Sequence, residues 1–145
     1  MESLTIKNLF FSYDGKPLLK DISLSLKKGE FLSIVGSSGC GKSTIIKLIA
    51  GIEKADSGTI KSESTGYMPQ KDLLLPWRTV LDNILLPVEI SKQNLKVEKE
   101  KALEYLKKLK LDEYQNSFPN ELSGGMRQRV SFLRTLFTQG EILLL

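Results

Sequence analysis

A glycine-rich stretch in the first third of the sequence has the residue types and spacing of a phosphate-binding loop. The segment Gly36–Ser43 reads GSSGCGKS and fits the pattern G-x-x-x-x-G-K-[S/T]. Glycines let successive backbone N–H groups turn toward an anion, because no Cβ atom limits the backbone angles or the approach of phosphate oxygens. Lys42 could then reach the β- and γ-phosphates of a nucleotide, and the Ser43 hydroxyl could bind Mg²⁺. The alternative is a surface turn with a solvated lysine.

The residues on both sides of this loop predict the strand and the helix that such a loop requires. Phe31–Val35 is a short apolar run with β-branched residues, which is typical of a buried strand. Thr44–Ala50 is an apolar helical segment, and Gly51 is a residue type that ends helices. The helix would add its unpaired N–H groups and the positive end of its dipole. This context favours phosphate binding over a simple turn.

The composition is that of a globular protein. The 145 residues are 26% charged and 41% hydrophobic, which indicates neither disorder nor a membrane span. No apolar run is long enough to cross a membrane, and residues 1–3 do not begin a secretion signal. A single cysteine, Cys40, excludes an internal disulfide and suits a reducing compartment. We therefore expect a cytoplasmic protein.

The net charge of +4 is only a weak indication of nucleic-acid binding. It results from 21 basic and 17 acidic residues, and many lysines lie between Lys92 and Lys110. Leucines repeat at helical spacing within Leu95–Leu111, so the lysines are better explained as the solvated face of a helix. We expect no nucleic-acid partner.

The first part of the chain favours antiparallel strands. Leu4–Phe11 and Ile22–Leu26 have strand patterns, with turn residues at Asp14–Pro17 between them. Tyr13 precedes the turn, where its ring could stack on a nucleotide base, although packing is the commoner role of such a tyrosine. Two further strands are expected at Thr59–Lys61 and Thr65–Met68.

The pattern then changes from strands to helices. Leu73–Trp77 is an apolar loop that would form core or, if exposed, a partner surface. A helix is expected to start at Thr79 and to kink or end at Pro87, and a second helix covers Leu95–Leu111.

A second glycine pair opens the last predicted helix. The segment Leu122–Arg129 reads LSGGMRQR, and Ser123 is a capping residue for a helix that we expect to continue to Gly140. The bare backbone of the two glycines and the helix N-terminus could accept an anion, and the alternative is an ordinary N-cap. Ile142–Leu145 starts another apolar strand.

Together these motifs resemble the ATP-binding cassette (ABC) subunits of membrane transporters. The phosphate-binding loop, Gln70 after a strand, and LSGG at Leu122–Gly125 have the order and spacing of that family, and the resemblance covers nearly the whole chain. The stretch LLLPWRTVLDNI, Leu73–Ile84, resembles the subgroup that serves importers of nitrate, sulfonates, taurine and similar anions.

The resemblance implies an α/β fold with a P-loop NTPase core, an N-terminal antiparallel β part and a helical subdomain. The chain would be a partial ATP-binding domain with an incomplete core sheet. Its parts would be a β part and P-loop core at 1–72, the helical subdomain at 73–120, and the signature helix with the start of the Walker B strand at 121–145. The implied function is to couple MgATP binding and hydrolysis to solute import, at the cytoplasmic face of the membrane.

The resemblance also implies the residues that bind ATP and Mg²⁺. The ATP-binding residues would be Tyr13, Gly36, Ser37, Ser38, Gly39, Cys40, Gly41, Lys42, Ser43 and Thr44. Tyr13 would stack on adenine, while Ser43 and Gln70 would contribute to the Mg²⁺ site. The signature residues Ser123, Gly124, Gly125 and Met126 would contact the ATP of a second copy. The implied partners are that second subunit and membrane permease subunits, the latter through Leu73–Trp77.

Cys40 allows a further hypothesis. The thiol precedes a helix and lies two residues before Lys42, so we expect it to be reactive. The alternative is a small residue that fills a tight loop.

Three catalytic residues of the family have no counterpart in this sequence. In the family the strand begun at Ile142 ends in a Mg²⁺-binding aspartate followed by a glutamate that polarises water, and both would lie beyond Leu145. The family also uses a switch histidine, and the sequence contains no histidine. We therefore assign no catalytic residue, and we expect the 145-residue chain to bind MgATP weakly or not at all.

Two other classes of function stay open. DNA-repair cassettes carry a long coiled-coil insertion that the span from Ser43 to Ser123 cannot hold, and translation-type cassettes usually occur twice in one chain, so gene length would discriminate. A non-enzymatic fragment that acts through a partner would fold but show no nucleotide affinity in a titration. The transported solute is not indicated, because other subunits recognise it.

We predict that the pure 145-residue chain does not hydrolyse ATP in the steady state. Phosphoryl transfer requires a placed metal ion and water as well as bound phosphates. Phosphate release measures the rate, and a rate that disappears in the Lys42→Ala variant would contradict the prediction.

Overall fold

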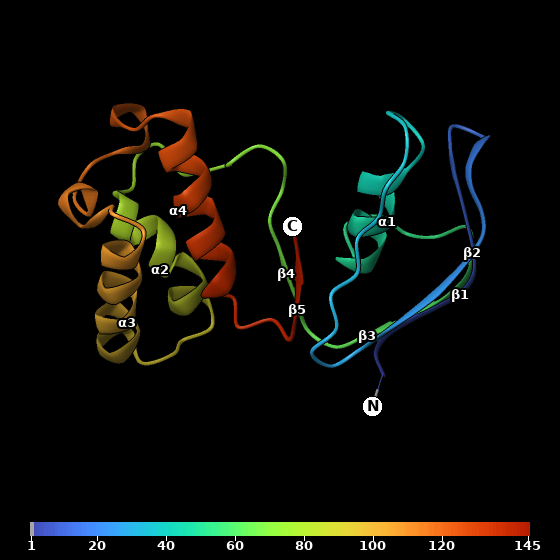
Figure 1. Cartoon of the computed structure of the whole chain (residues 1–145), viewed down its shortest axis with the longest axis horizontal. Coiled ribbons are helices and arrows are strands. Elements are labelled where there is room, and N and C mark those ends of the chain that lie inside the picture. The colour runs from blue at the N-terminus through green and yellow to red at the C-terminus, as the bar shows by residue number, and fades with distance from the viewer. Residues whose placement is uncertain (1) are drawn as a thin grey trace. The chain divides into compact units, whose positions relative to one another are not determined.

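A tight turn at Asp14 and Gly15 begins the fold. In the computed structural model, which describes residues 2–145, both residues have positive φ angles, 47° and 75°, as the two-residue turns of hairpins require. The turn joins two antiparallel strands, β1 (Glu2–Tyr13) and β2 (Lys16–Lys27). Strand β3 (Ser57–Ser62) pairs antiparallel with the other edge of β1, so the sheet order is β2-β1-β3 (Figure 1). The expected antiparallel β part is therefore confirmed.

A bulge in β1 requires a glycine on the neighbouring strand. Asn8 in β1 and Asp21 in β2 both adopt left-handed φ angles, 47° and 53°, and Asn8 Nδ2 donates a hydrogen bond of 2.8 Å to Asp21 Oδ1. Gly58 in β3 lies against this bulge with a φ of 92°. A Cβ atom at Gly58 would lie 2.7 Å from the Cα atom of Leu9 and closer still to the Asn8 carbonyl oxygen. The β1–β3 pairing therefore has room only for glycine here.

The chain divides into two compact units. The first comprises the residues up to Thr65 together with Leu144, and the second comprises Gly66–Leu143 and Leu145. The first contains the three-stranded sheet and helix α1 (Lys42–Ile49). Its buried apolar side chains are Leu4, Ile6, Leu9, Phe11, Leu19, Ile45, Leu48, Ile49 and Leu144. No helix in residues 2–145 is long and apolar enough to cross a membrane.

The strand expected at Phe31–Val35 is absent. The segment has no regular secondary structure, and Phe31 and Val35 are 92% and 86% exposed. A strand needs a neighbour for its backbone N–H and C=O groups, and no strand within residues 2–145 pairs with this segment. The apolar pattern alone did not indicate whether a pairing partner is in place. Strands β4 (Thr65–Tyr67) and β5 (Ile142–Leu144) pair with each other in a separate two-stranded sheet.

The second unit is mostly helical, as expected. Its helices are α2 (Val80–Ile90), α3 (Leu95–Lys108) and α4 (Gly124–Leu136), with short 3-10 helices η1 (Asp112–Tyr114) and η2 (Pro119–Glu121). The predicted start at Thr79 is confirmed, because the Thr79 hydroxyl accepts a hydrogen bond of 3.2 Å from the backbone N–H of Asp82. Such a bond satisfies one of the free N–H groups at a helix start.

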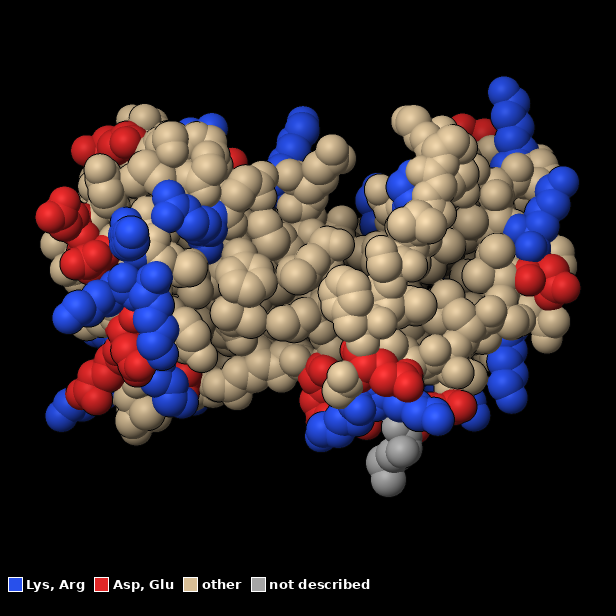
Figure 2. All heavy atoms as spheres, viewed as in Figure 1, with Lys and Arg blue, Asp and Glu red and all other residues tan. Residues whose placement is uncertain are grey.

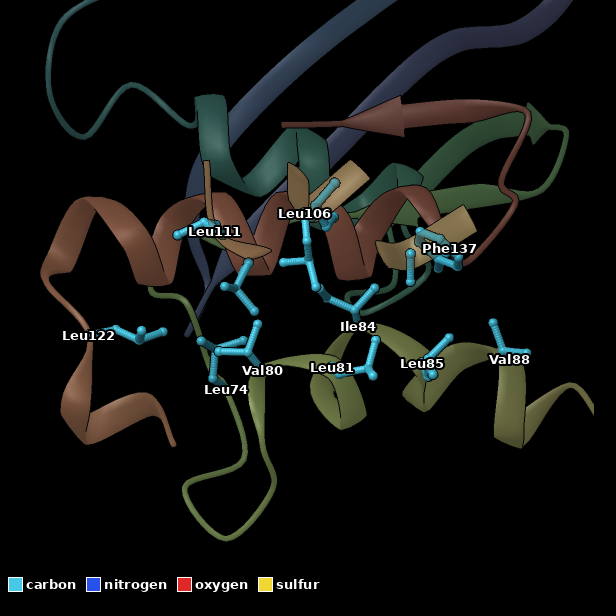
Figure 3. Close-up of a cluster of buried hydrophobic side chains, with 13 residues drawn as sticks. Leu74, Val80, Leu81, Ile84, Leu85, Val88, Leu106, Leu111, Leu122 and Phe137 are labelled. Carbon is cyan, nitrogen blue, oxygen red and sulfur yellow. The ribbon is translucent and has the colours of Figure 1, made fainter. Parts of the chain in front are cut away.

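An apolar cluster holds the second unit together, where α2 packs against α3 and α4. Figure 3 shows Leu81, Leu85 and Val88 directed from α2 into this cluster. Its members are Leu74, Val80, Leu81, Ile84, Leu85, Val88, Ala102, Leu106, Leu111, Leu122, Val130, Leu133 and Phe137. The stripes of apolar residues that predicted these helices are thus their buried faces.

The lysine-rich segment is a solvated helix face, as the sequence predicted. Figure 2 shows basic and acidic side chains interspersed over the surface formed by α3. Lys101 and Lys108 each make an ion pair of 2.7 Å on this helix, with Glu98 and Glu104 respectively. Positive charge is therefore partly offset by acidic neighbours on the same helix.

The sequence predicted a kink or an end of the helix at Pro87, and the helix does not end there; α4 ends earlier than expected. Helix α2 continues past Pro87 to Ile90, because only the last turn follows the proline and the Ser91 hydroxyl donates a hydrogen bond of 2.8 Å to the Pro87 carbonyl. Helix α4 ends at Leu136 and not at Gly140. Gln139 already adopts a left-handed φ of 55°, so the chain leaves the helix before the glycine.

We predict that Gly58→Ala destabilises the chain more than Gly15→Ala does. Both substitutions place alanine at a positive φ, at a cost of about 1–2 kcal/mol, but only the Gly58 variant adds a contact with backbone atoms. The extra loss should be about 1–3 kcal/mol. Urea unfolding followed by circular dichroism measures both, and equal losses would contradict the close packing at the bulge.

Candidate nucleotide-binding site

The loop before α1 has the bare backbone that a phosphate group requires. Gly39 and Gly41 adopt left-handed φ angles of 79° and 99°, which disfavour other residue types. A Cβ atom at Gly41 would lie 2.6 Å from Leu19 Cδ2, and one at Gly36 would lie 2.7 Å from Cys40 Sγ. The loop therefore presents backbone atoms where larger residues would place side chains, and this geometry fits a phosphate group.

Lys42 lies across this loop. Its ammonium group donates hydrogen bonds to the carbonyl oxygens of Gly36 (2.9 Å) and Ser37 (2.7 Å) and lies 3.8 Å from Cys40 Sγ. The positive charge of Lys42 is thus held at the loop by two neutral carbonyl oxygens. A phosphate anion could replace them as hydrogen-bond acceptor.

The next two residues differ in exposure: Ser43 is exposed and Thr44 is buried. The exposed Ser43 offers its hydroxyl to a metal ion. Residues 2–145 contain no group of three or more His, Cys, Asp or Glu side chains that could hold a metal ion. A Mg²⁺ ion here would depend on hydroxyl, phosphate and water oxygens, a ligand set that Mg²⁺ accepts.

Helices α1 and α4 differ from α2 and α3 in having no acidic residue in the first turn. Asp82 lies in the first turn of α2 and Glu98 in that of α3, whereas the first turns of α1 and α4 contain no acidic residue. Carboxylates at a helix start offset the positive end of the helix dipole. The N-termini of α1 and α4 keep that potential available for an external anion.

Tyr13 lies at the end of β1 and is 41% exposed. Its ring packs edge-on against Phe11, with ring centroids 4.7 Å apart, and its hydroxyl donates a hydrogen bond of 3.4 Å to Glu53 Oε1. Phe11 is paired with Leu19 across the β1–β2 ladder, and Leu19 lies against Gly41 of the loop. Packing therefore connects the tyrosine to the base of the loop, and stacking on adenine stays a prediction.

The signature segment begins α4. The Ser123 hydroxyl oxygen accepts a hydrogen bond of 3.3 Å from the backbone N–H of Met126, so the serine is an N-cap. Ser123, Gly124 and Gly125 are exposed, and Met126 packs against the apolar cluster. The contact of this segment with ATP on a second copy stays a prediction.

Gln70 is exposed beyond β4, and its backbone is held by α4. Its carbonyl oxygen accepts a hydrogen bond of 3.1 Å from Gln128 Nε2. The predicted ATP-binding residues all belong to the first unit, whereas Gln70 and the signature residues belong to the second.

The loop Leu73–Trp77 is partly buried and partly exposed. Leu74 is 8% exposed and belongs to the core, while Leu73 and Trp77 are 60% and 71% exposed. The side-chain amide of the buried Asn83 in α2 holds the loop. Asn83 Oδ1 accepts from the Leu75 N–H (2.8 Å), and Nδ2 donates to the Leu75 carbonyl (3.1 Å). The sequence analysis missed this residue, although an asparagine inside an apolar helix stripe is a usable signal.

Sequence reasoning also missed Arg127 and Arg134 on α4. Arg127 Nε donates a hydrogen bond of 3.1 Å to Asp72 Oδ2, and Arg134 donates to the backbone carbonyls of Asp72 and Leu73. Burial lowers the pKa of the Arg134 guanidinium from its usual value, and the negative charge of Asp72 opposes this effect. Arginine remains charged at neutral pH. The seven-residue spacing of these two arginines on one helix face was the available signal.

A loop GSSGCGKS at the start of one helix and LSGGMRQR at the start of another define the class of ATP-binding cassettes. Residues 19–145 match the sequence profile of the family described as ABC transporter, so the chain belongs to that family. The fold agrees: the ATP-binding cassette MJ0796, solved as a dimer in a post-hydrolysis state with ADP and Pi, has a TM-score of 0.86. It is 31% identical, and the match covers 97% of this chain and 72% of that one.

Two relatives are named as import ATP-binding proteins. The formylaminopyrimidine import ATP-binding protein ThiZ of Halalkalibacterium halodurans is 40% identical over 99% of this chain. The aliphatic sulfonates import ATP-binding protein SsuB 2 of Agrobacterium fabrum is 43% identical over 99% of this chain. The chain spans 59% and 56% of the lengths of these two relatives.

We predict that iodoacetamide modifies Cys40 alone and that ATP slows the reaction. Cys40 is the one cysteine of the sequence and is exposed, and its sulfur faces Gly36 across the loop. A group added to this sulfur would occupy the phosphate cradle and prevent nucleotide binding. Intact mass spectrometry measures the rate, with the Cys40→Ser variant as the unlabelled control. Slow labelling that ATP does not change would contradict the prediction.

Proposed function

We propose that the chain is the ATP-binding part of an ABC importer subunit, which couples MgATP binding and hydrolysis to solute import. The observation that carries the proposal is the glycine cradle before α1, with Lys42 held over it. The names of the two relatives support the importer class.

The roles proposed for the residues follow from their positions. The backbone N–H groups of the loop and of the first turn of α1 would bind the phosphates, and Lys42 would bind the β- and γ-phosphates. Ser43 and Gln70 would contribute to the Mg²⁺ site, and Tyr13 would stack on the adenine. A bound Mg²⁺ ion would neutralise phosphate charge at this site. These contacts would give the 145-residue chain weak affinity for MgATP.

We further propose that the site is completed by a second copy. The exposed Ser123–Gly125 backbone offers N–H groups at the start of α4, whose first turn contains no acidic residue, and these would contact ATP held by the partner. The dimeric state of MJ0796 supports an assembly of this kind.

The exposed Leu73 and Trp77 are proposed as a contact for membrane permease subunits at the cytoplasmic face. Both side chains are apolar and lie in a loop that Asn83 holds in place. Tryptophan is enriched where proteins bind one another. The solute is proposed to be an anion such as nitrate or a sulfonate, which the stretch Leu73–Ile84 and the name of the Agrobacterium fabrum relative support.

We predict that Lys42→Ala weakens ATP binding by about 10–100-fold, because hydrogen bonds to charged groups contribute about 1.5–3 kcal/mol. Lys47→Ala is the matched control, because Lys47 lies in the last turn of the same helix. Isothermal titration with ATP measures both variants. Equal affinity of the two variants would contradict the proposed phosphate site.

A further inference from the structure

The segment that carries Gln70 is fastened to α4 by a row of side chains. Gln128 Nε2 bonds the Gln70 carbonyl at 3.1 Å, and Arg127 Nε bonds the Asp72 carboxylate at 3.1 Å. The contacts come from the same helix that begins at the signature serine, so one rigid element holds this segment.

Arg134 supplies the most specific part of this attachment. Its two terminal nitrogens donate to two successive carbonyls, Nη1 to Leu73 at 2.8 Å and Nη2 to Asp72 at 2.7 Å. Leu73 has a left-handed φ of 46°, and both carbonyls reach one guanidinium. A planar guanidinium can bind two acceptors at once, which an ammonium group cannot do with the same geometry.

Arg127 connects the segment directly to the signature. Besides its bond to Asp72, Arg127 donates through Nη1 to the carbonyl of Leu122 at 2.8 Å, and Leu122 immediately precedes Ser123. The other oxygen of Asp72 accepts the Leu74 N–H at 3.2 Å. Asp72 thus fixes the backbone on one side and the arginine on the other.

We propose that Arg127, Gln128 and Arg134 are positioning residues for Gln70. Gln128 and Arg134 bind the backbone of residues 70–73, and Arg127 binds the Asp72 carboxylate. Gln70 stays exposed, and it belongs to one rigid body with Ser123. The proposal rests on the proposed function, since it takes Gln70 to contribute to the Mg²⁺ site of bound ATP. A loop anchor without this role would stabilise the fold and leave the effect of Mg²⁺ unchanged.

The same helix offers a matched control. Arg129 also lies on α4, and its guanidinium bonds the carbonyls of Leu109 (2.7 Å) and Gly125 (3.4 Å), not the segment of residues 70–74. Arg129→Ala therefore removes the same charge from the same helix and leaves the Gln70 segment attached.

Amide hydrogen exchange, followed by NMR on the 145-residue chain without nucleotide, tests the attachment. Arg134→Ala should speed exchange of the Leu74 amide by about tenfold, because this amide depends on the placement of Asp72. Arg129→Ala should exchange like the wild type. The Leu75 amide is the internal reference, because it is bonded to Asn83. Equal Leu74 exchange in the two variants would overturn the proposal.

ATP titrations with Mg²⁺ and with EDTA test the positioning role. Arg134→Ala should leave the affinity in EDTA unchanged and reduce the Mg²⁺ enhancement by about tenfold, as loss of a supporting residue around a metal site does. Gln70→Ala should have the same effect, and the double variant should lose no more than either single variant. Arg134→Lys should not restore the enhancement, because an ammonium group lacks the rigid planar fork with which the guanidinium meets the two carbonyls.

The outcomes separate this proposal from the proposed function. Of the two outcomes that the sequence allows, weak binding and no binding, the proposed function requires weak binding. Absence of ATP binding by the wild type in EDTA and in Mg²⁺ would refute it, and the exchange of the Leu74 amide would still decide whether α4 holds the segment. Where ATP binds, a Mg²⁺ enhancement that Arg134→Ala retains, or that Arg129→Ala loses equally, overturns the positioning role. Gln128→Ala, which removes one neutral hydrogen bond, provides a milder variant if Arg134→Ala does not fold.

Discussion

The free N–H groups at the start of α1 are the physical constraint around which the first unit is built. A helix start needs acceptors for these groups, and α1 has neither a capping side chain nor an acidic residue to supply them. The chain approaches this helix through Gly41 in a left-handed conformation, with Leu19 of β2 packed against it. The sheet therefore contacts the loop through Leu19, and the loop has a bare backbone and a lysine at the point where an anion would be stabilised.

In the second unit, the apolar core fixes the helices, and a set of polar side chains fixes the loop that precedes α2. The apolar cluster fixes α2 and α4 against each other, but apolar packing has no directional preference and does not specify the path of an irregular loop. Asn83 and Arg134 provide that path, because their hydrogen bonds go to backbone groups of residues 72–79. The loop consequently has a defined course and still exposes Trp77 and the Gln70 side chain.

Much of the fold could be predicted from local patterns. The Asp14–Gly15 turn, the helix start at Thr79 and the solvated lysine face of α3 all follow from residues that lie within a few positions of one another. The glycine loop could also be predicted, because its motif consists of eight consecutive residues. The strand prediction that failed was based on a local pattern, but strand formation also depends on a distant partner. Phe31–Val35 reads as a strand, yet a strand exists only where a neighbour accepts its hydrogen bonds.

The sequence by itself determined the class of this protein: a phosphate-binding loop and an LSGG segment, each at a helix start, in a chain of the ABC transporter family. Only the tertiary structure decided how Gln70 is held, because Arg127 and Arg134 meet the Gln70 segment from more than 50 positions away in the chain. It also decided which residues of the apolar loop are core and which are exposed. The physical reason is the same in both cases: a local pattern records the preference of a residue, whereas a hydrogen-bond partner or a burial site is supplied by distant parts of the chain.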